Sequence, residues 1–202
     1  MGDVTSGLRE RKKLATRHAL HVAALQLVAE RGLDSVSVDE IADRADVSPR
    51  TFFNYFSSKD DAVIGLDPAA PQELFDAFSS RPAEESPVEA LRAVQRERAE
   101  EMGAEPELWP LRMQVIDAHP VLVQRLIAGF SESERMLAEA IAQRTGTEAG
   151  VDAYPTLLAS VQACVMRTAL HRWLATDFTA SLPVLVDESW DVLVAGLPAP
   201  PR

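Results

Sequence analysis

The apolar positions of the chain recur every three or four residues over long stretches, and strict alternation of apolar and polar residues is rare. This is the period of an α-helix, which brings residues three and four apart onto one face. Leu14, Leu25 and Val28 belong to such a pattern, which predicts an amphipathic helix over residues 9–31. Gly32 follows it and is expected to take the left-handed conformation that ends many helices.

Serine residues mark the starts of the next helices. Ser37 opens the sequence S-V-D-E, in which a serine at the N-cap and Glu40 three residues later form a capping box. A gap long enough only for a tight turn separates this short helix from Ser48 and Pro49, a second cap followed by a proline at the first helical position. We expect the second helix to run to about residue 55 or 56.

The rest of the chain continues the helical pattern. Ser57 or Ser58 caps a helix that begins at Lys59, and Ser86 with Glu89 forms a second capping box after a proline-rich stretch. The further helices are predicted at about residues 71–79, 87–102, 106–117, 120–145, 154–176 and 182–196. The sequence therefore predicts an all-α protein.

Four of the twelve aromatic residues crowd into the second short helix, within the stretch S-P-R-T-F-F-N-Y-F that begins at Ser48. Phe52 and Phe56 lie four residues apart and share a helix face, so they are expected to fill the core of a small three-helix domain. Five polar or amphipathic side chains remain exposed on this helix: Ser48, Arg50, Thr51, Asn54 and Tyr55.

Those exposed groups have the chemistry of DNA recognition. Arginine pairs with guanine O6 and N7, and asparagine pairs with adenine N6 and N7. Hydroxyl and ammonium groups suit phosphate oxygens. Two short helices joined by a tight turn, with such groups on the second, describe a helix-turn-helix and its recognition helix. The alternative is a helical hairpin with an ordinary polar face.

The charge distribution restricts where a polyanion can bind. The chain has a net charge of −11, but residues 1–60 carry nine basic and nine acidic residues, so the excess lies in residues 61–202. Near the N-terminus only Glu10 opposes a basic head, which consists of Arg9, Arg11, Lys12, Lys13 and Arg17. A polyanion would meet the N-terminal part and be repelled by the rest. The alternative for the head is a solvated basic tail.

The run S-V-S-V-D-E-I-A-D-R-A-D-V-S-P-R-T-F-F-N-Y-F-S-S-K-D-D-A-V resembles the DNA-binding domain of the TetR family of bacterial transcriptional regulators. The resemblance covers about residues 9–66 and implies phosphate contacts from Ser37 and Thr51. It also implies major-groove positions for Ser48, Pro49, Arg50 and Asn54, and backbone contacts from Tyr55 and Lys59. Three residues depart from the family pattern: Asp46 replaces a glycine, Phe53 a tyrosine, and Arg50 a common glycine.

For residues 67–197 the resemblance implies a helical effector-binding and dimerisation domain. A homodimer would form through the helices at about 154–176 and 182–196, and two recognition helices would read a palindromic double-stranded operator. The segment 106–130 weakly resembles the subgroup that includes the mycofactocin regulator, which implies a small lipophilic, acyl-CoA-like effector. Candidate pocket residues are Trp109, Met113, Ile116, Leu126 and Phe130, with Arg112 or His119 at a polar head. Plain core packing is the alternative for each of them.

Catalytic and metal chemistry find little support. His18 and His21 have a spacing that could suit a metal, but nothing near them completes a site. Cys164 and His171 lie seven residues apart without a third group to orient them. No glycine-rich phosphate loop occurs, so we expect no cofactor, no metal and no enzymatic activity. One cysteine, no apolar leader and no membrane-spanning stretch favour a cytoplasmic protein.

The sequence thus predicts a ligand-responsive transcriptional regulator, acting as a repressor that an effector releases from its operator. Two other classes stay open. One is a lipophile-binding carrier or enzyme without specific DNA binding. The other is a nonspecific architectural DNA binder, which would show no sequence preference at moderate salt.

Overall fold

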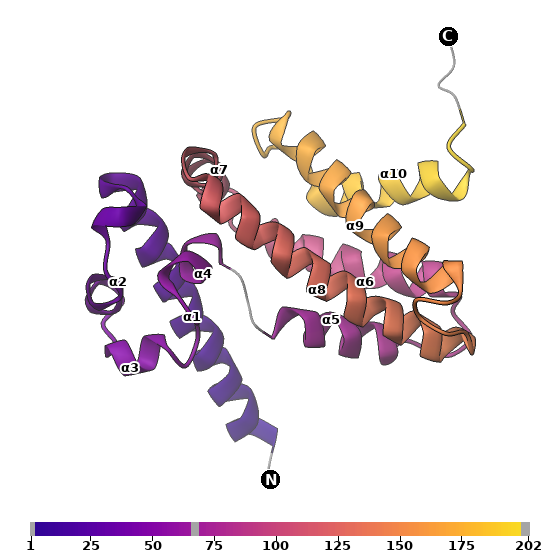
Figure 1. Cartoon of the computed structure of the whole chain (residues 1–202), viewed down its shortest axis with the longest axis horizontal. Helices are drawn as coiled ribbons and strands as arrows, with labels where there is room; N and C mark the ends of the chain where they lie inside the picture. Colours follow the sequence, from indigo (N-terminus) through magenta and orange to yellow (C-terminus); the bar gives the residue numbers. More distant parts are fainter. Residues whose placement is uncertain (1–2, 66–68, 199–202) are drawn as a thin grey trace. The chain divides into compact units, whose positions relative to one another are not determined.

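The computed structural model describes residues 3–65 and 69–198, with side chains from residue 11, and every regular element within these ranges is a helix. The predicted all-α fold class is confirmed. No helix in the described ranges is both long and apolar enough to cross a bilayer. The helices are α1 (Asp3–Arg31), the 3-10 turn η1 (Leu33–Ser35), α2 (Val38–Arg44), α3 (Pro49–Phe52), α4 (Lys59–Ile64), α5 (Ala70–Ser79), α6 (Pro87–Met102), α7 (Leu108–Ala118), α8 (Pro120–Thr145), α9 (Ala153–Leu174) and α10 (Leu182–Val194) (Figure 1).

Helices α5 to α10 begin and end within two residues of their predicted bounds, as expected from the usual uncertainty of helix ends. Two differences occur at α1. It starts at Asp3, not at residue 9, so the helix is longer at its N-terminal end than the apolar pattern predicted. Gly32, which follows α1, has the predicted positive φ of 81°, but its ψ of 154° lies outside the left-handed helical region, in backbone space that favours glycine.

The chain divides into two compact units. The N-terminal unit comprises the described residues of Met1–Pro68 together with Glu107–Gly129, and the C-terminal unit comprises Ala69–Pro106 together with the described residues from Phe130 onward. The predicted boundary at residues 66 and 67 lies outside the described residues. The segment 107–129 was predicted in the second domain, but it groups with the first because its apolar residues are buried in the N-terminal core.

The core of the N-terminal unit forms along α1, which packs against α2, α4 and α7 (Figure 1). Leu20, Leu25 and Ile41 are completely buried there. Helix α7 and the start of α8 contribute the buried residues Val115, Ile116 and Leu122 to the same cluster. Two segments that are distant in sequence therefore share one hydrophobic core.

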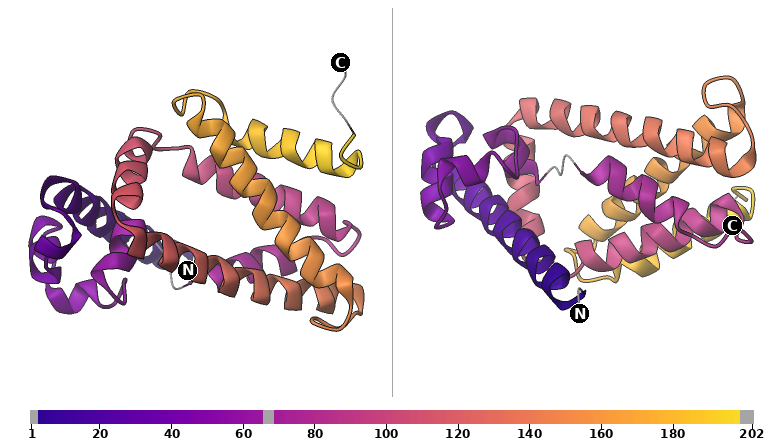
Figure 2. Two further views of the ribbon diagram at one scale, coloured as in Figure 1. Left: turned by 45° about the horizontal axis from the view of Figure 1, so that its top comes forward. Right: turned by 90° about the horizontal axis from the view of Figure 1, so that it is seen from below.

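In the C-terminal unit, α10 packs against both α6 and α9, as the two views of Figure 2 show. Trp173 on α9 and Trp190 on α10 are the largest side chains in this unit that are almost fully buried. Arg92 on α6 forms ion pairs with Asp187 and Asp191 on α10, on the outside of this packing. Buried apolar side chains thus hold the three helices together, and ion pairs at the edge of this packing add a link between α6 and α10.

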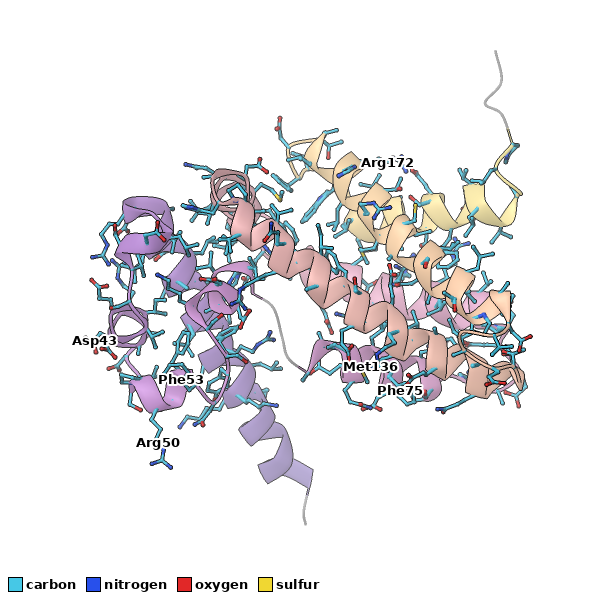
Figure 3. The ribbon with its side chains drawn as sticks, in the orientation of Figure 1. Asp43, Arg50, Phe53, Phe75, Met136 and Arg172 are labelled. Carbon is cyan, nitrogen blue, oxygen red and sulfur yellow. The ribbon has the colours of Figure 1, made fainter. Side chains whose placement is uncertain are left out.

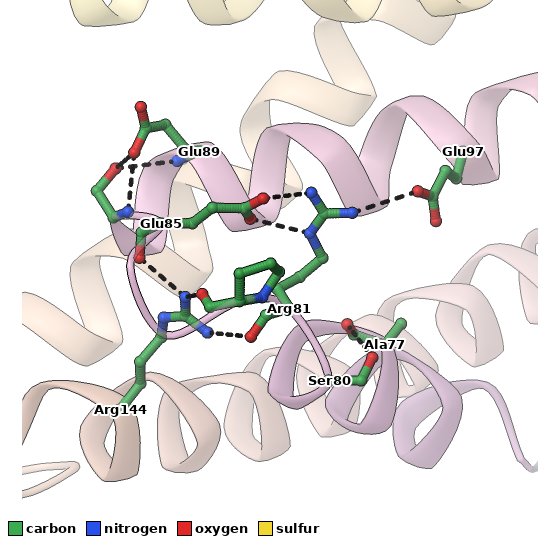
Figure 4. Close-up of polar contacts among 9 residues, drawn as sticks. Ala77, Ser80, Arg81, Glu85, Glu89, Glu97 and Arg144 are labelled. Atoms are coloured by element: carbon green, nitrogen blue, oxygen red, sulfur yellow. Dashed lines mark hydrogen bonds and ion pairs between the residues drawn. The ribbon is translucent and has the colours of Figure 1, made fainter.

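A polar cluster fixes the connection between α5 and α6 (Figure 4). The guanidinium of Arg81 binds the carboxylate of Glu85 through two nitrogens. Arg144, near the end of α8, donates to the backbone carbonyls of Arg81, Pro82 and Glu85 and lies over the ring of Phe78. The side chain of Arg144 therefore attaches the α5–α6 connection to α8 by binding backbone carbonyls of that connection.

Candidate nucleic-acid interface

The first helix of the candidate interface, α2, begins at the predicted capping box. The Ser37 hydroxyl accepts a hydrogen bond from the backbone N–H of Glu40 at 3.3 Å, and the Glu40 carboxylate accepts one from the backbone N–H of Ser37 at 2.9 Å. The bonds from the Ser37 backbone and hydroxyl, followed by that from Arg31, lower the pKa of Glu40 to about 2. The start of α2 is therefore fixed by residues adjacent in sequence.

The turn after α2 depends on Asp46. Its φ of 54° places it in the left-handed region that the sequence required of this position, and aspartate adopts that region more readily than most residues. The backbone N–H of Val47 then donates to the carbonyl of Ala42 at 2.9 Å and closes the turn. The departure from glycine at this position is therefore compatible with the turn geometry.

Helix α3 is shorter than predicted and spans only Pro49–Phe52. Ser48 caps it by accepting a hydrogen bond from the backbone N–H of Thr51 at 3.1 Å. Beyond the helix, the N–H of Asn54 bonds to the carbonyl of Thr51, three residues back, so the chain continues as a tighter turn of 3-10 type. The recognition element is thus one helical turn extended by one tighter turn.

The inner face of this element holds the aromatic residues predicted for the core. Phe52 and Phe56 have 0% and 1% of their surface exposed, and their ring centroids lie 5.9 Å apart. They belong to the same buried cluster as Ile41 and Ala42 of α2. Large rings fill the small interior and fix the orientation of α3.

The outer face carries the polar groups that the sequence predicted for DNA. Ser48, Pro49, Arg50 and Asn54 are exposed, and Thr51 is half-buried. Figure 3 shows the Arg50 side chain pointing away from the ribbon into solvent. Within the described residues, the guanidinium of Arg50 makes no hydrogen bond or ion pair. It is therefore available for a ligand, and its contact with DNA stays a prediction.

Three other predicted DNA contacts are engaged inside the protein. The Lys59 ammonium donates to the carbonyls of Leu33 and Val36 at 2.7 and 3.0 Å, which uses two of its three hydrogens. The Ser37 hydroxyl donates to the Glu40 carboxylate. Tyr55 is half-buried and packs against the core cluster. Lys59 therefore ties the turn after α1 to α4, a structural role that its sequence position did not reveal.

The predicted basic head divides into an exposed and an inward part. Arg17 points inward: its guanidinium donates to the carbonyl of Gly65 and lies 5.4 Å from the centroid of the Phe56 ring. The side chain of Arg9 lies outside the described residues. Three members are exposed on α1: Arg11, Lys12 and Lys13. The exposed positive charge of the head therefore lies on the N-terminal turns of α1.

Groups from two other helices bind the carbonyls at the end of α4. Nδ1 of His21 donates to the carbonyl of Ala62 at 2.7 Å, and the Arg112 guanidinium donates to the carbonyl of Ile64. Gly65 ends the helix at a φ of 66°, and a Cβ there would lie 3.0 Å from the His21 ring. Sequence reasoning missed this arrangement because its partners lie 41 and 48 residues apart and no local pattern marks them.

Burial changes the acidity of both groups. Desolvation, followed by the nearby charge of Arg112, lowers the pKa of His21 to about 4, so its imidazole is neutral at pH 7. Desolvation also lowers the pKa of Arg112 to about 10. The Arg112 guanidinium lies 4.7 Å from the centroid of the Trp109 ring, and no carboxylate of the described residues pairs with it. Arg112 is thus a cation without an acidic partner in the described chain.

The predicted effector residues are only partly brought together. Trp109 and Arg112 are in contact, and Met113 is half-buried on the same helix. Ile116 is 6% exposed in the core of the N-terminal unit, so lining an open pocket would require this core to open. Phe130 is 56% exposed on α8 and belongs to the C-terminal unit.

Open cavities occur among the described residues of the C-terminal unit, and the predicted effector residues do not line the two described next. One, of about 350 Å³, lies between α8 and the start of α9 and includes Arg135, Ala138 and Ala159. The other, of about 380 Å³, lies at the turn between α9 and α10 and includes Trp173 and Phe178. Sequence reasoning did not identify either cavity, because each is formed by residues from separate helices.

Exposed apolar side chains also occur on α9 and α10, the two helices predicted to form the dimer. Such residues are costly to leave in water when they gather on one element. On α9 they are Tyr154, Leu157 and Leu174, and on α10 they are Val184, Val192 and Val194. Both helices therefore bury one set of apolar residues within the unit and expose another.

Two family models match the chain, one over the helix-turn-helix and one over most of the later helices. The family model described as bacterial regulatory proteins of the TetR family matches residues 20–63, which contain α2, α3 and most of α4 with the end of α1. A second model, described as the MftR C-terminal domain, matches residues 85–198, more than half of the chain.

Two relatives are similar along nearly the whole chain. The transcriptional regulator TcmR of Streptomyces glaucescens is 33% identical over 196 residues, which cover 93% of this chain and 86% of TcmR. A Mycobacterium tuberculosis protein named as the mycofactocin biosynthesis regulator MftR is 30% identical over 190 residues and 93% of each chain.

Among solved structures, FadR of Bacillus subtilis in complex with stearoyl-CoA has a TM-score of 0.56 at 18% identity, over 89% of this chain and 98% of FadR. SmeT, the repressor of a Stenotrophomonas maltophilia efflux pump, has a TM-score of 0.55 at 18% identity, over 92% of this chain and 97% of SmeT. At these identities the structures show a shared fold. Together with the two family models and the relatives named as regulators, they identify the chain as a helix-turn-helix transcriptional regulator that belongs to the TetR family.

Proposed function

We propose that this regulator is a ligand-responsive repressor, which binds a palindromic operator as a homodimer and leaves it when a small lipophilic effector binds. The observation that carries the proposal is the outer face of α3, where Arg50 and Asn54 are exposed beside the caps of a rigid one-turn helix. Its inner face is fixed by buried Phe52 and Phe56. A recognition element of this kind presents base-reading groups with little loss of conformational freedom on binding.

In this proposal, the outer face of α3 enters the major groove. Arg50 donates to guanine O6 and N7, and Asn54 pairs with the edge of adenine. Ser48, Pro49 and Thr51 lie beside the groove, and Ser37, Tyr55 and Lys59 approach the phosphates. The Lys59 ammonium has one hydrogen left for a phosphate, because two are bound to carbonyls. Base reading therefore rests on few residues of one protomer.

A homodimer follows from this small reading surface, because one recognition element contacts too few base pairs to select a site. Two elements separated by one DNA turn or a multiple would read a palindrome. The exposed apolar residues of α9 and α10 support these helices as the shared interface. Contact between two copies would bury Leu157 and Val192, which are now 62% and 52% exposed.

The proposed effector is a lipophile with an anionic group. Arg112 supports the anionic group, because this half-buried residue has no acidic partner among the described residues. The Trp109 ring beside it offers an apolar surface. FadR, which shares the fold, was solved with stearoyl-CoA, and SmeT with triclosan, so this fold accommodates lipophiles of different shapes.

Release from DNA requires the effector to prefer a conformation that does not fit the operator. An anion on Arg112 would compete with the Ile64 carbonyl, the group that Arg112 now binds at the end of α4. Because α4 also carries Lys59, such competition would act on an element of the DNA-binding unit itself. We place the protein in the cytoplasm, where its operator lies, and assign it no catalytic step.

Selection of bound DNA tests the proposal. Fragments of the source genome are incubated with the full-length protein at two salt concentrations, and the retained fragments are sequenced. Recovery of one palindromic site that survives the higher salt is the expected result, since nonspecific phosphate binding weakens steeply with salt. Recovery of no preferred sequence would overturn operator binding and favour the alternative, a lipophile-binding carrier or enzyme.

A further inference from the structure

One apolar side chain stands out on the polar face of the recognition element. Phe53 is 59% exposed, and it is the one large apolar side chain within residues 33–65, all of which are described, that is exposed. Every other large apolar residue in this range is buried or half-buried. Full burial of a phenyl group is favourable by about 1.5–3 kcal/mol, so its exposure at this position loses stability that a polar residue would not lose.

The ring of Phe53 is held in place, and it cannot turn into the core. Its backbone N–H donates to the carbonyl of Pro49 at 3.2 Å. Its ring stands edge-on to that of Phe52, with centroids 5.4 Å apart and an interplanar angle of 84°. Phe52 and Phe56 already fill the space beneath α3. The ring therefore presents a pre-ordered apolar surface to the outside.

The neighbours of Phe53 determine what this surface meets. Arg50 lies three residues before Phe53 and four before Asn54, the spacings that make side chains neighbours on a helical turn, and all three side chains are exposed. In the proposed complex these side chains lie against base edges. The apolar group that base edges offer in the major groove is the C5-methyl of thymine. A phenyl ring has no hydroxyl to donate to a phosphate, so an apolar contact is the one that its chemistry favours.

We propose that Phe53 reads sequence by packing on the C5-methyl of a thymine in each operator half-site. The inference rests on the proposed function, because it requires α3 to enter the major groove. It adds a third reader to Arg50 and Asn54, and it makes the half-site prefer thymine next to the bases that those two side chains recognise. Cytosine lacks the methyl group and would be disfavoured at that position.

The test uses deoxyuridine, which differs from thymidine only in lacking this methyl group. Each thymine of the selected operator is replaced in turn, at symmetric positions, and the dissociation constant of the full-length protein is measured. We expect one symmetric pair to weaken binding about fourfold per half-site, which corresponds to the ~0.8 kcal/mol of one buried methyl. Phe53→Ala should bind the thymine operator more weakly and lose all sensitivity to this replacement.

Two variants complete the design. Phe53→Tyr keeps the ring and should keep the sensitivity to deoxyuridine. Leu14→Ala removes an apolar side chain of similar exposure from α1, and should leave the sensitivity unchanged. A replacement series with no effect, or an effect that persists undiminished in Phe53→Ala, would overturn the inference while leaving operator binding intact. If selection recovers no preferred site, the proposed function and this inference both fall.

Discussion

The indole Nε1 of Trp190 donates a hydrogen bond of 2.7 Å to the side-chain oxygen of Gln95, and both side chains are completely buried between α10 and α6. The amide nitrogen of Gln95 donates in turn to the backbone carbonyl of Gln162 on α9 at 2.8 Å. One glutamine thus satisfies polar groups of two neighbouring helices. Buried polar groups with full partners favour one arrangement of the packed helices over others.

This relationship predicts a large coupling between the two residues. Gln95→Leu leaves the indole N–H of Trp190 buried without an acceptor, which should lower the free energy of unfolding by about 1–3 kcal/mol. Trp190→Phe should also destabilise, by leaving a void and an unpaired amide oxygen. The double variant should lose less than the sum of the single variants, as measured by urea denaturation. Strictly additive losses would contradict the coupling.

The acidity of His21 predicts how stability changes with pH. Its pKa falls from 6.5 to about 4 on folding, so the unfolded chain binds the proton more readily between these values. Stability is therefore fully present above pH 6.5 and is lost as the pH falls towards 4, by about 3 kcal/mol from this residue. His21→Gln should remove this contribution to the slope of stability against pH, as measured by urea denaturation at several pH values.

Substitutions of Arg50 and Lys59 should differ in their effects on operator affinity and on the stability of the fold. Arg50→Ala removes an exposed side chain without a described partner, so stability should change by less than about 0.5 kcal/mol. Operator binding should nevertheless weaken by about 1–3 kcal/mol, with relaxed preference at one base position. Lys59→Ala leaves two carbonyls without their donor and should lower the free energy of unfolding by about 1–3 kcal/mol.

Thermal denaturation and operator titration of both variants check this prediction. Equal losses of stability in Arg50→Ala and Lys59→Ala would contradict it. So would an Arg50→Ala protein that binds the operator as tightly as the wild type.

Asp46 predicts a stabilising substitution. Its left-handed backbone carries a steric cost for any residue with a Cβ, and glycine avoids this cost but loses more chain entropy on folding. The balance at φ 54° should favour Asp46→Gly by about 0.5–1 kcal/mol. A raised midpoint of thermal unfolding with unchanged operator affinity is the expected result. Asp43→Gly, within α2, is the matched control and should destabilise instead.

The proposed dimer predicts that Leu157→Asp yields monomers. A carboxylate on the exposed face of α9 would be buried between two copies without a partner, which association cannot offset. Sedimentation velocity should show the mass of one chain, and operator affinity should fall at least tenfold because each half-site then binds alone. Val151→Asp places the same charge on an exposed valine outside α9 and α10, and should remain dimeric.

Much of the local structure could be predicted because its causes are local. Ser37, Ser48 and Ser86 each accept a hydrogen bond from the backbone N–H three residues later. The spacing of serine, proline and glutamate in the sequence predicts such caps. Phe52 and Phe56 were assigned to the core from their spacing alone, and they lie there. Recognition of the family followed from the same stretch.

What could not be predicted depends on contacts between distant segments. Ile116 was expected at a pocket, yet it is buried beside residues of α1 and α4, because hydrophobicity does not reveal which partner an apolar residue will meet. Lys59 was predicted at a phosphate, and that contact stays a prediction, but its ammonium also binds two carbonyls more than twenty residues away, which the sequence did not indicate. The sequence gives the charge of a lysine but not its contacts. Whether the side chain stabilises the fold, binds DNA or does both can be seen only in the structure.

The shared core of α1 and α7 has a consequence for how the protein is made. Val115, Ile116 and Leu122 belong to the same core as residues of the first 65 positions, with the segment Ala69–Pro106 folded elsewhere in between. A nascent chain released only as far as α4 would lack part of this interior. The DNA-binding unit can therefore mature on the ribosome only after the whole intervening segment has emerged, and such delayed, non-local closure slows folding.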